Sequence, residues 1–114
     1  MKLYFYNAIV TNIYDGDTIR ANIDLRFNTW IFDQKLRLYG IDTPEIRGEE
    51  RPYGLIAKDF VNERIPVGTD IKVMTKRDAT GKYGRYLATI FYDNGRNLNE
   101  ELIESGNAER YMVG

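Results

Sequence analysis

Apolar and polar residues alternate on either side of Asp15-Gly16, and few folds can accommodate that pattern. Residues 3–14 are rich in Tyr, Phe, Ile and Val. In residues 17–27, polar residues alternate with Ile19, Ala21, Ile23 and Leu25. Such alternation is typical of strands that bury one face, and an Asp-Gly pair between two of them favours a type I′ hairpin turn. The sequence therefore predicts a β-hairpin with one face in the core.

A third strand and a first helix are predicted next. Asn28 and Thr29 form a turn before a strand at residues 32–41, in which two leucines face one way and Arg37 faces the other. Apolar residues at helical spacing then predict a helix at residues 55–64, with its stripe made by Ile56, Ala57, Phe60 and Val61.

The last third of the chain predicts two strands and a second helix. The strands lie at residues 70–76 and 85–92, and an Asn94-Gly95 turn follows. Asn97 and Glu100 have the spacing of a capping box, which opens a helix that stops at Gly106. The order is three strands, a helix, two strands and a helix.

This order, in a chain of 114 residues, indicates one domain over residues 1–114. We expect a mainly β (α+β) fold: a five-stranded antiparallel barrel of the OB type with two helices. The first residues lack the pattern of a signal peptide, which favours an intracellular protein over a trimmed secreted form.

The amino-acid composition excludes several classes of catalytic mechanism. The chain has no cysteine and no histidine, which excludes disulfides, thiol nucleophiles and every mechanism that depends on an imidazole. The net charge of −1 creates no bulk attraction for nucleic acid or anionic lipid. An enzyme with this sequence must work with carboxylates, arginine, lysine, tyrosine and a hard metal ion.

The motif DGDT, which begins at Asp15, places two carboxylates at the end of the predicted hairpin. Carboxylate oxygens are suitable ligands for a hard cation. Taken alone, the motif is better explained as ordinary turn chemistry, because Asp-Gly is a common hairpin turn pair.

The segment RLYGIDTPE is more specific. A strand delivers Arg37, and Asp42 and Glu45 flank the stiff dipeptide Thr43-Pro44. Such a backbone suits side chains that must hold a metal and a water in a fixed geometry. The alternative is a loop before a helix, with both carboxylates merely solvated.

The segment KYGR contributes Lys82, Tyr83 and Arg85. Arg85 and Arg37 together could clamp one phosphodiester group. Each arginine alone is better explained as an exposed surface residue, and Tyr83 fits core packing equally well.

In order and spacing, DGDT, R-x4-DTPE, KYGR and NEELIESG-x-A resemble the staphylococcal nuclease (thermonuclease) family, from about residue 8 to residue 111. The resemblance implies an OB-fold barrel and a calcium-dependent phosphodiesterase that cleaves DNA and RNA to leave 3′-phosphates. It implies Ca²⁺ as cofactor, DNA and RNA as partners with single strands preferred, and a monomer.

The resemblance also implies a role for individual residues. Asp17 and Asp42 match calcium-binding carboxylates, and the main-chain carbonyl of Thr43 is a further ligand. Glu45 matches the carboxylate that orients or deprotonates the attacking water. The remaining matches are the phosphate-binding arginines Arg37 and Arg85, the nucleotide contacts Lys82 and Tyr83, and Tyr111, which corresponds approximately to a tyrosine that flanks the nucleotide.

Three departures from the family stand out. The loop IRGEERP is shorter and poorer in lysine, which predicts weaker DNA affinity, and the third C-terminal helix of the family is absent from the sequence. The match of Tyr111 is only approximate. Two alternatives stay open: a non-catalytic module that binds nucleic acid or protein, and a calcium-binding structural domain, which leaves both arginines unexplained.

Overall fold

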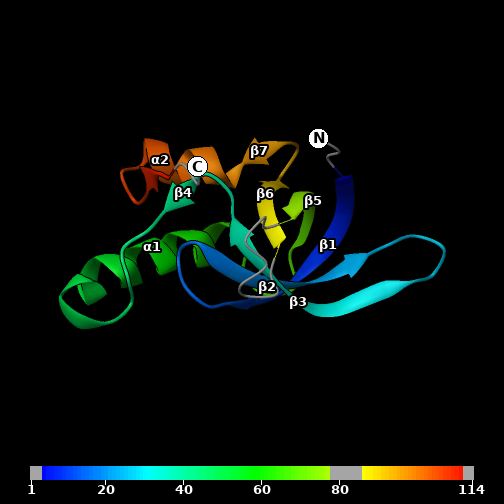
Figure 1. Cartoon of the computed structure of the whole chain (residues 1–114), viewed down its shortest axis with the longest axis horizontal. Helices are drawn as coiled ribbons and strands as arrows, with labels where there is room; N and C mark the ends of the chain where they lie inside the picture. Colours follow the sequence, from blue (N-terminus) through cyan, green and yellow to red (C-terminus); the bar gives the residue numbers. More distant parts are fainter. Residues whose placement is uncertain (1–3, 78–85, 112–114) are drawn as a thin grey trace.

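The computed structural model describes residues 4–77 and 86–111 (Figure 1). Its five long strands are β1 (Tyr4–Ile13), β2 (Thr18–Asp24), β3 (Trp30–Leu38), β5 (Asp70–Arg77) and β6 (Tyr86–Tyr92). The two-residue strands are β4 (Ile41–Asp42), β7 (Arg96–Asn97) and β8 (Glu109–Arg110). The helices are the 3-10 turn η1 (Gly48–Glu50), α1 (Arg51–Arg64) and α2 (Leu98–Glu104). In this part of the chain no helix is long and apolar enough to cross a membrane.

The long strands form the predicted OB-type barrel. They are ordered β3-β2-β1-β5-β6, and each pair of neighbours in that series is antiparallel. The barrel closes through β3 and β6, which run parallel from Leu36↔Tyr86 to Leu38↔Ala88. The expectation of a wholly antiparallel barrel is therefore wrong for one pair. In a ring of five strands direction cannot alternate all the way round, so one pair must be parallel.

One hydrophobic cluster fills the barrel. Leu36 and Leu38 of β3 are almost completely buried in it, and Arg37 between them lies outside it, as the alternation predicted. The largest fully buried side chains are Ile19, Leu36, Leu38, Ile65, Ile90, Leu98, Leu102, Val10, Val61 and Val73. Each contributes about 1.5–3 kcal/mol to folding through removal of apolar surface from water. The core thus fixes which way every residue of β3 faces.

Helix α1 begins at Arg51, four residues before the predicted start. Pro52 occupies its first turn, where a missing N–H costs nothing. The prediction followed the apolar stripe, and the first turn carries none of it. The buried face consists of Gly54, Ala57 and Val61, whereas Ile56 is exposed.

Helix α2 begins as predicted, with the Asn97 side chain accepting a hydrogen bond from the Glu100 N–H at 3.1 Å. The Glu100 carboxylate accepts from Arg110 of β8 at 3.0 Å. The buried Asn99 amide donates to the carbonyls of Tyr39 and Ala88. Helix α2 is therefore hydrogen-bonded to β6, to Tyr39 after β3 and to Arg110 of β8.

The β2–β3 hairpin extends beyond the barrel, at the end of the molecule opposite α1 (Figure 1). Its turn spans residues 25–29, where the Leu25 N–H donates to the Thr29 carbonyl at 2.8 Å. Arg26, Phe27 and Asn28 all have left-handed φ angles. The turn is therefore longer than the predicted Asn28-Thr29 turn, and β3 starts at Trp30 instead of residue 32.

Candidate active site

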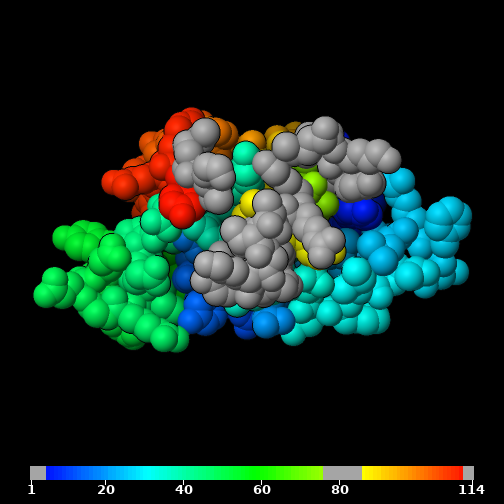
Figure 2. Space-filling view, viewed as in Figure 1, coloured from blue at the N-terminus to red at the C-terminus, as the bar shows by residue number. Residues whose placement is uncertain are grey.

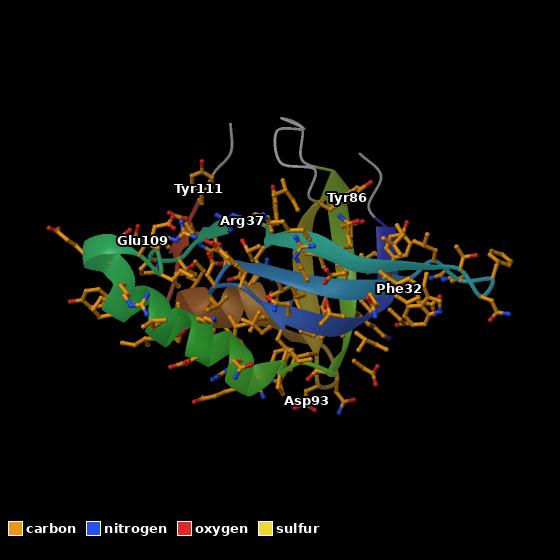
Figure 3. All side chains as sticks on the ribbon, turned by 90° about the horizontal axis from the view of Figure 1, so that it is seen from below. Phe32, Arg37, Tyr86, Asp93, Glu109 and Tyr111 are labelled. Atoms are coloured by element: carbon orange, nitrogen blue, oxygen red, sulfur yellow. The ribbon has the colours of Figure 1, made fainter. Side chains whose placement is uncertain are left out.

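A polar cavity of about 280 Å³ lies between the 14–18 turn, β3 and the loop that follows β4. It is lined by Tyr14, Asp15, Asp17, Thr18, Lys35, Arg37, Asp42 and Glu45. The structure therefore brings together four residues that the sequence singled out in two separate motifs: Asp17, Arg37, Asp42 and Glu45. Figure 3 shows Arg37 at the cavity end of β3.

The turn at residues 14–18 is not the predicted type I′ turn. Neither Asp15 nor Gly16 is among the residues with positive φ, which that turn requires at both central positions. The carbonyl of Thr18 accepts from the N–H groups of Tyr14 and Asp15, at 3.1 and 3.3 Å. The Asp15 carboxylate accepts from the Asp17 N–H at 3.0 Å. This wider turn directs both aspartates into the cavity.

Gly16 is required for space. A Cβ atom there would lie 2.7 Å from Cβ of Ala57 and 2.9 Å from Cγ2 of Thr43. Because such separations are too short for carbon atoms, only glycine lets the turn approach both α1 and the Thr43-Pro44 segment. The close approach places Asp17 beside Thr43.

Asp17 connects the three parts of the site. Its Oδ2 atom accepts from the Thr43 N–H at 3.1 Å, and its Oδ1 atom accepts from the Thr18 hydroxyl at 3.2 Å. Its main-chain carbonyl accepts from the Leu38 N–H at 2.8 Å. A carboxylate held by this many bonds has a defined position before any ligand arrives.

Arg37 is held between two carboxylates. Its Nη1 atom lies 3.4 Å from Oδ2 of Asp17, and its Nη2 atom lies 3.4 Å from Oδ1 of Asp42. Nη1 also donates to the Leu38 carbonyl at 3.0 Å. The Arg37 side chain is 12% exposed, so the charge is largely removed from bulk water. A buried guanidinium with paired charges is fixed in place and retains its positive field.

The site carries an excess of negative charge. Burial, together with the Asp17 carboxylate, raises the pKa of Asp15 to about 7. Burial and the charge of Asp17 also raise the pKa of Asp42, against the opposing effect of Arg37. Raised pKa values mean that the ionised carboxylates are unfavourable as they stand. The cavity therefore favours an additional cation.

Over residues 4–77 and 86–111, no three acidic side chains lie close enough together to form a complete metal site. The donors that are present nevertheless fit a hard cation. Two carboxylates, those of Asp17 and Asp42, contact the same guanidinium, and the main chain of Thr43 is bonded to Asp17. The two carboxylates supply oxygen donors, which suit Ca²⁺, with further oxygens and water completing its six to eight ligands.

The other predicted residues lie at the edge of the cavity or outside it. Glu45 is exposed at the rim, and its N–H faces the Glu50 carboxylate at 3.5 Å. Tyr111 does not line the cavity; its N–H donates to the Gly40 carbonyl at 2.9 Å, and its side chain is exposed. Lys82, Tyr83 and Arg85 lie outside the described residues.

The family resemblance gave no role to Asp15 or Lys35, although the sequence offered both carboxylates of DGDT as possible cation ligands. Lys35 lies two residues before Arg37 on β3, so strand alternation could have placed both on the same face. Asp15 belongs to the DGDT motif, but its interpretation as a turn residue did not predict that it lines the cavity. Burial of the turn against α1 is a tertiary effect that has no local signal.

Comparisons with known proteins agree with this geometry. Residues 35–114 match the family described as staphylococcal nuclease homologue. An uncharacterized protein of Methanocaldococcus jannaschii is 33% identical over 96% of this chain and 60% of its own length. A thermonuclease of Staphylococcus hyicus is 35% identical over 85% of this chain and 54% of its own length. The endonuclease YhcR of Bacillus subtilis is 28% identical over 95% of this chain and 9% of its own length.

The chain thus spans 60% or less of the length of each of these relatives. The family match nonetheless covers residues 35–114, which include the end of β3, the 42–45 loop and both helices and make up more than half of the chain. On this match, the chain belongs to the staphylococcal nuclease family.

Proposed function

We propose that this chain is a nuclease: a calcium-dependent phosphodiesterase that hydrolyses DNA and RNA by metal-assisted attack of water and leaves 3′-phosphate products. Family membership and relatives named as nucleases support the proposal. The observation that carries it is the partly buried Arg37 guanidinium, held within 3.4 Å of two carboxylates in an open polar cavity. Removing charged groups from water costs free energy, and a module without catalytic activity does not need such a group held in a cavity.

Arg37 would bind the scissile phosphate. During attack on a phosphodiester, the nonbridging oxygens gain negative charge, and a fixed guanidinium stabilises that charge without reorganising. The planar fork of arginine also matches two phosphate oxygens at once. Arg85, which lies outside the described residues, would bind the same phosphate, as the family resemblance implies.

Asp17, Asp42 and the Thr43 carbonyl would hold the calcium ion. When bound, Ca²⁺ supplies positive charge that stabilises the phosphate oxygens and makes a nearby water easier to deprotonate. Asp17 keeps its position through the Thr43 N–H, so the ligands from the two motifs stay together.

Glu45 would orient the attacking water and take its proton. The carboxylate lies at the rim of the cavity, where water has access. Lys82, Tyr83 and Tyr111 would contact the nucleotide, and a single strand would be preferred because its backbone can enter the cavity without melting a duplex.

The test is hydrolysis of a single-stranded oligonucleotide in Ca²⁺ and in EDTA, with the product ends analysed for 3′-phosphate. We expect cleavage in Ca²⁺ only. The Arg37→Ala protein, purified in parallel, excludes a contaminating nuclease. Absence of metal-dependent cleavage at every pH tested would refute the proposal. Salt-dependent binding that ignores calcium would instead favour the non-catalytic module.

A further inference from the structure

The end of the β2–β3 hairpin exposes large apolar side chains. Phe27 is 97% exposed, Phe32 is 72% exposed, and Trp30 and Ile31 are each 38% exposed. We call these four residues the hairpin patch. The β2–β3 hairpin that carries them projects at the end of the molecule opposite α1 (Figures 1 and 2). Apolar side chains grouped at a projecting tip indicate a binding surface.

The turn that carries Phe27 is rigidly built. Its residues Arg26, Phe27 and Asn28 have φ angles of 72°, 55° and 58°. The Arg26 N–H donates to the Asp24 carboxylate at 2.7 Å, and the Thr29 N–H donates to the Arg26 carbonyl at 3.0 Å. A bulky aromatic residue rarely adopts positive φ, so the strain at Phe27 is retained by the surrounding hydrogen bonds.

Cations lie between the hairpin patch and the cavity. Arg37 faces Thr18 and Lys35 faces Arg20 across the β2–β3 ladder, which places all four on the face of the sheet away from the core. The carboxylate of Asp33 is paired with Arg20 at 3.4 Å, so these two charges offset each other, and Lys35 is the further cation on this stretch of β3. Arg26 adds a further exposed cation at the tip, beside the Asp24 carboxylate that accepts from its N–H. Basic and aromatic side chains interleaved in this way are suited to a single-stranded nucleic acid.

We propose that the hairpin patch binds the bases of a single-stranded nucleic acid whose phosphate lies at Arg37, by stacking on Trp30, Phe27 and Phe32. This inference rests on the proposed function. Phe32 and Arg37 lie toward opposite ends of β3 (Figure 3). Five residues of strand span roughly 17 Å, which corresponds to about five stacked nucleotides. Shorter substrates would fill the cavity without reaching the patch.

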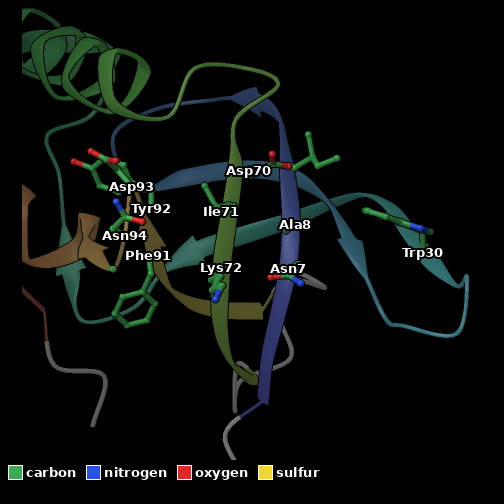
Figure 4. A pocket seen from close by; sticks show the side chains of 12 residues that line it. Asn7, Ala8, Trp30, Asp70, Ile71, Lys72, Phe91, Tyr92, Asp93 and Asn94 are labelled. Atoms are coloured by element: carbon green, nitrogen blue, oxygen red, sulfur yellow. The ribbon is translucent and has the colours of Figure 1, made fainter.

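A second hollow also borders Trp30, on the outer face of β1, β5 and β6 (Figure 4). Its volume is about 680 Å³, and its floor includes Asn7 and Lys72. The carboxylates of Asp70 and Asp93 also line it, so acidic groups outnumber its single lysine. A polyanion would be repelled there. The nucleic acid should therefore follow the hairpin and avoid this hollow.

Trp30 is the only tryptophan in the sequence, so its fluorescence reports on the patch directly. The experiment titrates Glu45→Gln protein with a thymidylate 12-mer and with a trimer, in Ca²⁺ and again in EDTA. We expect the 12-mer to quench Trp30 emission and the trimer to leave it unchanged. Replacement of Phe27 and Phe32 by serine should raise the Kd of the 12-mer at least about fivefold and leave that of the trimer unchanged.

Two control variants accompany the titration. Tyr53→Ser removes an exposed aromatic side chain from α1, and Lys72→Ala removes the lysine of the second hollow. Both should bind the 12-mer like the parent. Weaker binding by Lys72→Ala would overturn the path along the hairpin.

Three further results would overturn the inference. One is binding or hydrolysis of the 12-mer with no change in Trp30 emission. Another is emission that varies with protein concentration alone, which would assign the patch to a second copy of the chain. The third is a response to phosphatidylcholine–phosphatidylglycerol vesicles in place of the 12-mer. A separate assay tests the proposed function: if it is wrong, the parent protein will show no calcium-dependent hydrolysis of either the 12-mer or the trimer.

Discussion

At the scale of single residues, Arg37 shows how the core determines the site. Its two neighbours on β3 are leucines with almost no exposed surface, so strand alternation forces Arg37 to the opposite side. There the carboxylates of Asp17 and Asp42 offset the cost of removing the guanidinium from water. The position and orientation of this arginine therefore follow from its neighbours.

Arg37→Ala should lower kcat by about 10²-fold or more, because it removes a preorganised charge donor from the phosphate site. Arg37→Lys should be nearly as damaging, since an ammonium group cannot make the two-pronged contact. Steady-state kinetics on single-stranded DNA measures both, and Lys72→Ala, which changes an exposed lysine elsewhere on the barrel, should behave like the parent. Near-normal kcat in Arg37→Lys would show that only the charge matters.

Substitution of Glu45 should affect the rate of hydrolysis, whereas substitution of Asp42 should affect calcium affinity. Glu45→Gln should slow hydrolysis while calcium affinity stays largely unchanged, because this carboxylate acts on water. Asp42→Ala should weaken calcium binding itself, because it removes a ligand. Isothermal titration calorimetry with Ca²⁺ separates the two roles. Equal calcium affinity in Asp42→Ala and the parent would contradict the ligand assignment.

Sequence reasoning indicated candidate residues for the site more readily than their arrangement. Asp17, Asp42 and Glu45 stood in short polar motifs beside turn-forming or stiff residues, and the family resemblance implied their roles, which stay predictions. The burial of Asp15 was not, because it depends on α1 packing against the turn, with Ala57 filling the space beside Gly16. Lys82, Tyr83 and Arg85 remain predictions, since they lie outside the described residues.

At the scale of secondary-structure elements, α1 acts as the support of the acidic loop. Its buried face is built from small residues, and at Gly54 the helix lies directly against the main chain of Glu45 and Ile46. The sequence predicted the helix from its apolar stripe but could not show this contact. A glycine inside a helix is unfavourable by itself, so its presence here points to the close approach.

Gly54→Ala should therefore disturb Glu45. In an exposed helix the change would stabilise the fold by about 1 kcal/mol. Here the new methyl group would overlap the Glu45 carbonyl, and overpacking of this kind costs about 1–3 kcal/mol. We expect no gain in stability by urea unfolding and a fall in kcat of about tenfold or more. Ile56→Ala, on the exposed side of the same helix, should keep the parental kcat; a stabilised, fully active Gly54→Ala would show that the loop yields freely.

A second contact between elements makes stability depend on alkaline pH. The Tyr92 hydroxyl at the end of β6 donates to the Glu101 carboxylate of α2, which also accepts from Arg96 at 2.8 Å. Burial, with the hydrogen bond and charge of Glu101, raises the pKa of Tyr92 to about 12. The neutral phenol is therefore favoured in the folded state. Its stabilising effect is complete below the unfolded pKa of about 10 and is lost as pH rises toward 12.

Urea unfolding of the parent and Tyr92→Phe at a series of pH values tests this dependence. Below about pH 10 the parent should be more stable by about 1–2 kcal/mol, because a hydrogen bond to a charged group is lost in the variant. Above that pH the difference should shrink. The other tyrosines are the same in both proteins, so their contributions cancel in the difference. A difference that stays constant through the alkaline range would disprove the coupling.

At the scale of the whole molecule, closure of the barrel assembles the site from distant segments. The alternation of strands was readable from sequence, but the parallel β3–β6 pair was not, because it follows from the number of strands in the ring and not from any local pattern. Closure fixes β3 on both sides at Leu36 to Leu38, around Arg37. The same strand continues beyond the barrel to the hairpin patch, so one element carries both proposed contacts with nucleic acid.

Because the site joins the 14–18 turn to the 42–45 loop, calcium should stabilise the entire fold if the proposed function is correct. Burial and the charge of Asp17 raise the pKa of Asp42, so its ionised carboxylate is unfavourable in the folded protein. A bound cation would stabilise that carboxylate. At a calcium concentration 100 times the Kd, the free energy of unfolding should rise by about 2.7 kcal/mol. Urea unfolding in CaCl₂ and in EDTA at matched ionic strength measures this increase, with Asp17→Asn as the control that should lose it.

Arg37→Ala should show a larger dependence on calcium, since in the described part of the chain Arg37 is the cation that pairs with both carboxylates. Identical unfolding midpoints with and without calcium, in a protein that demonstrably binds it, would mean that the two acidic segments do not act as one site.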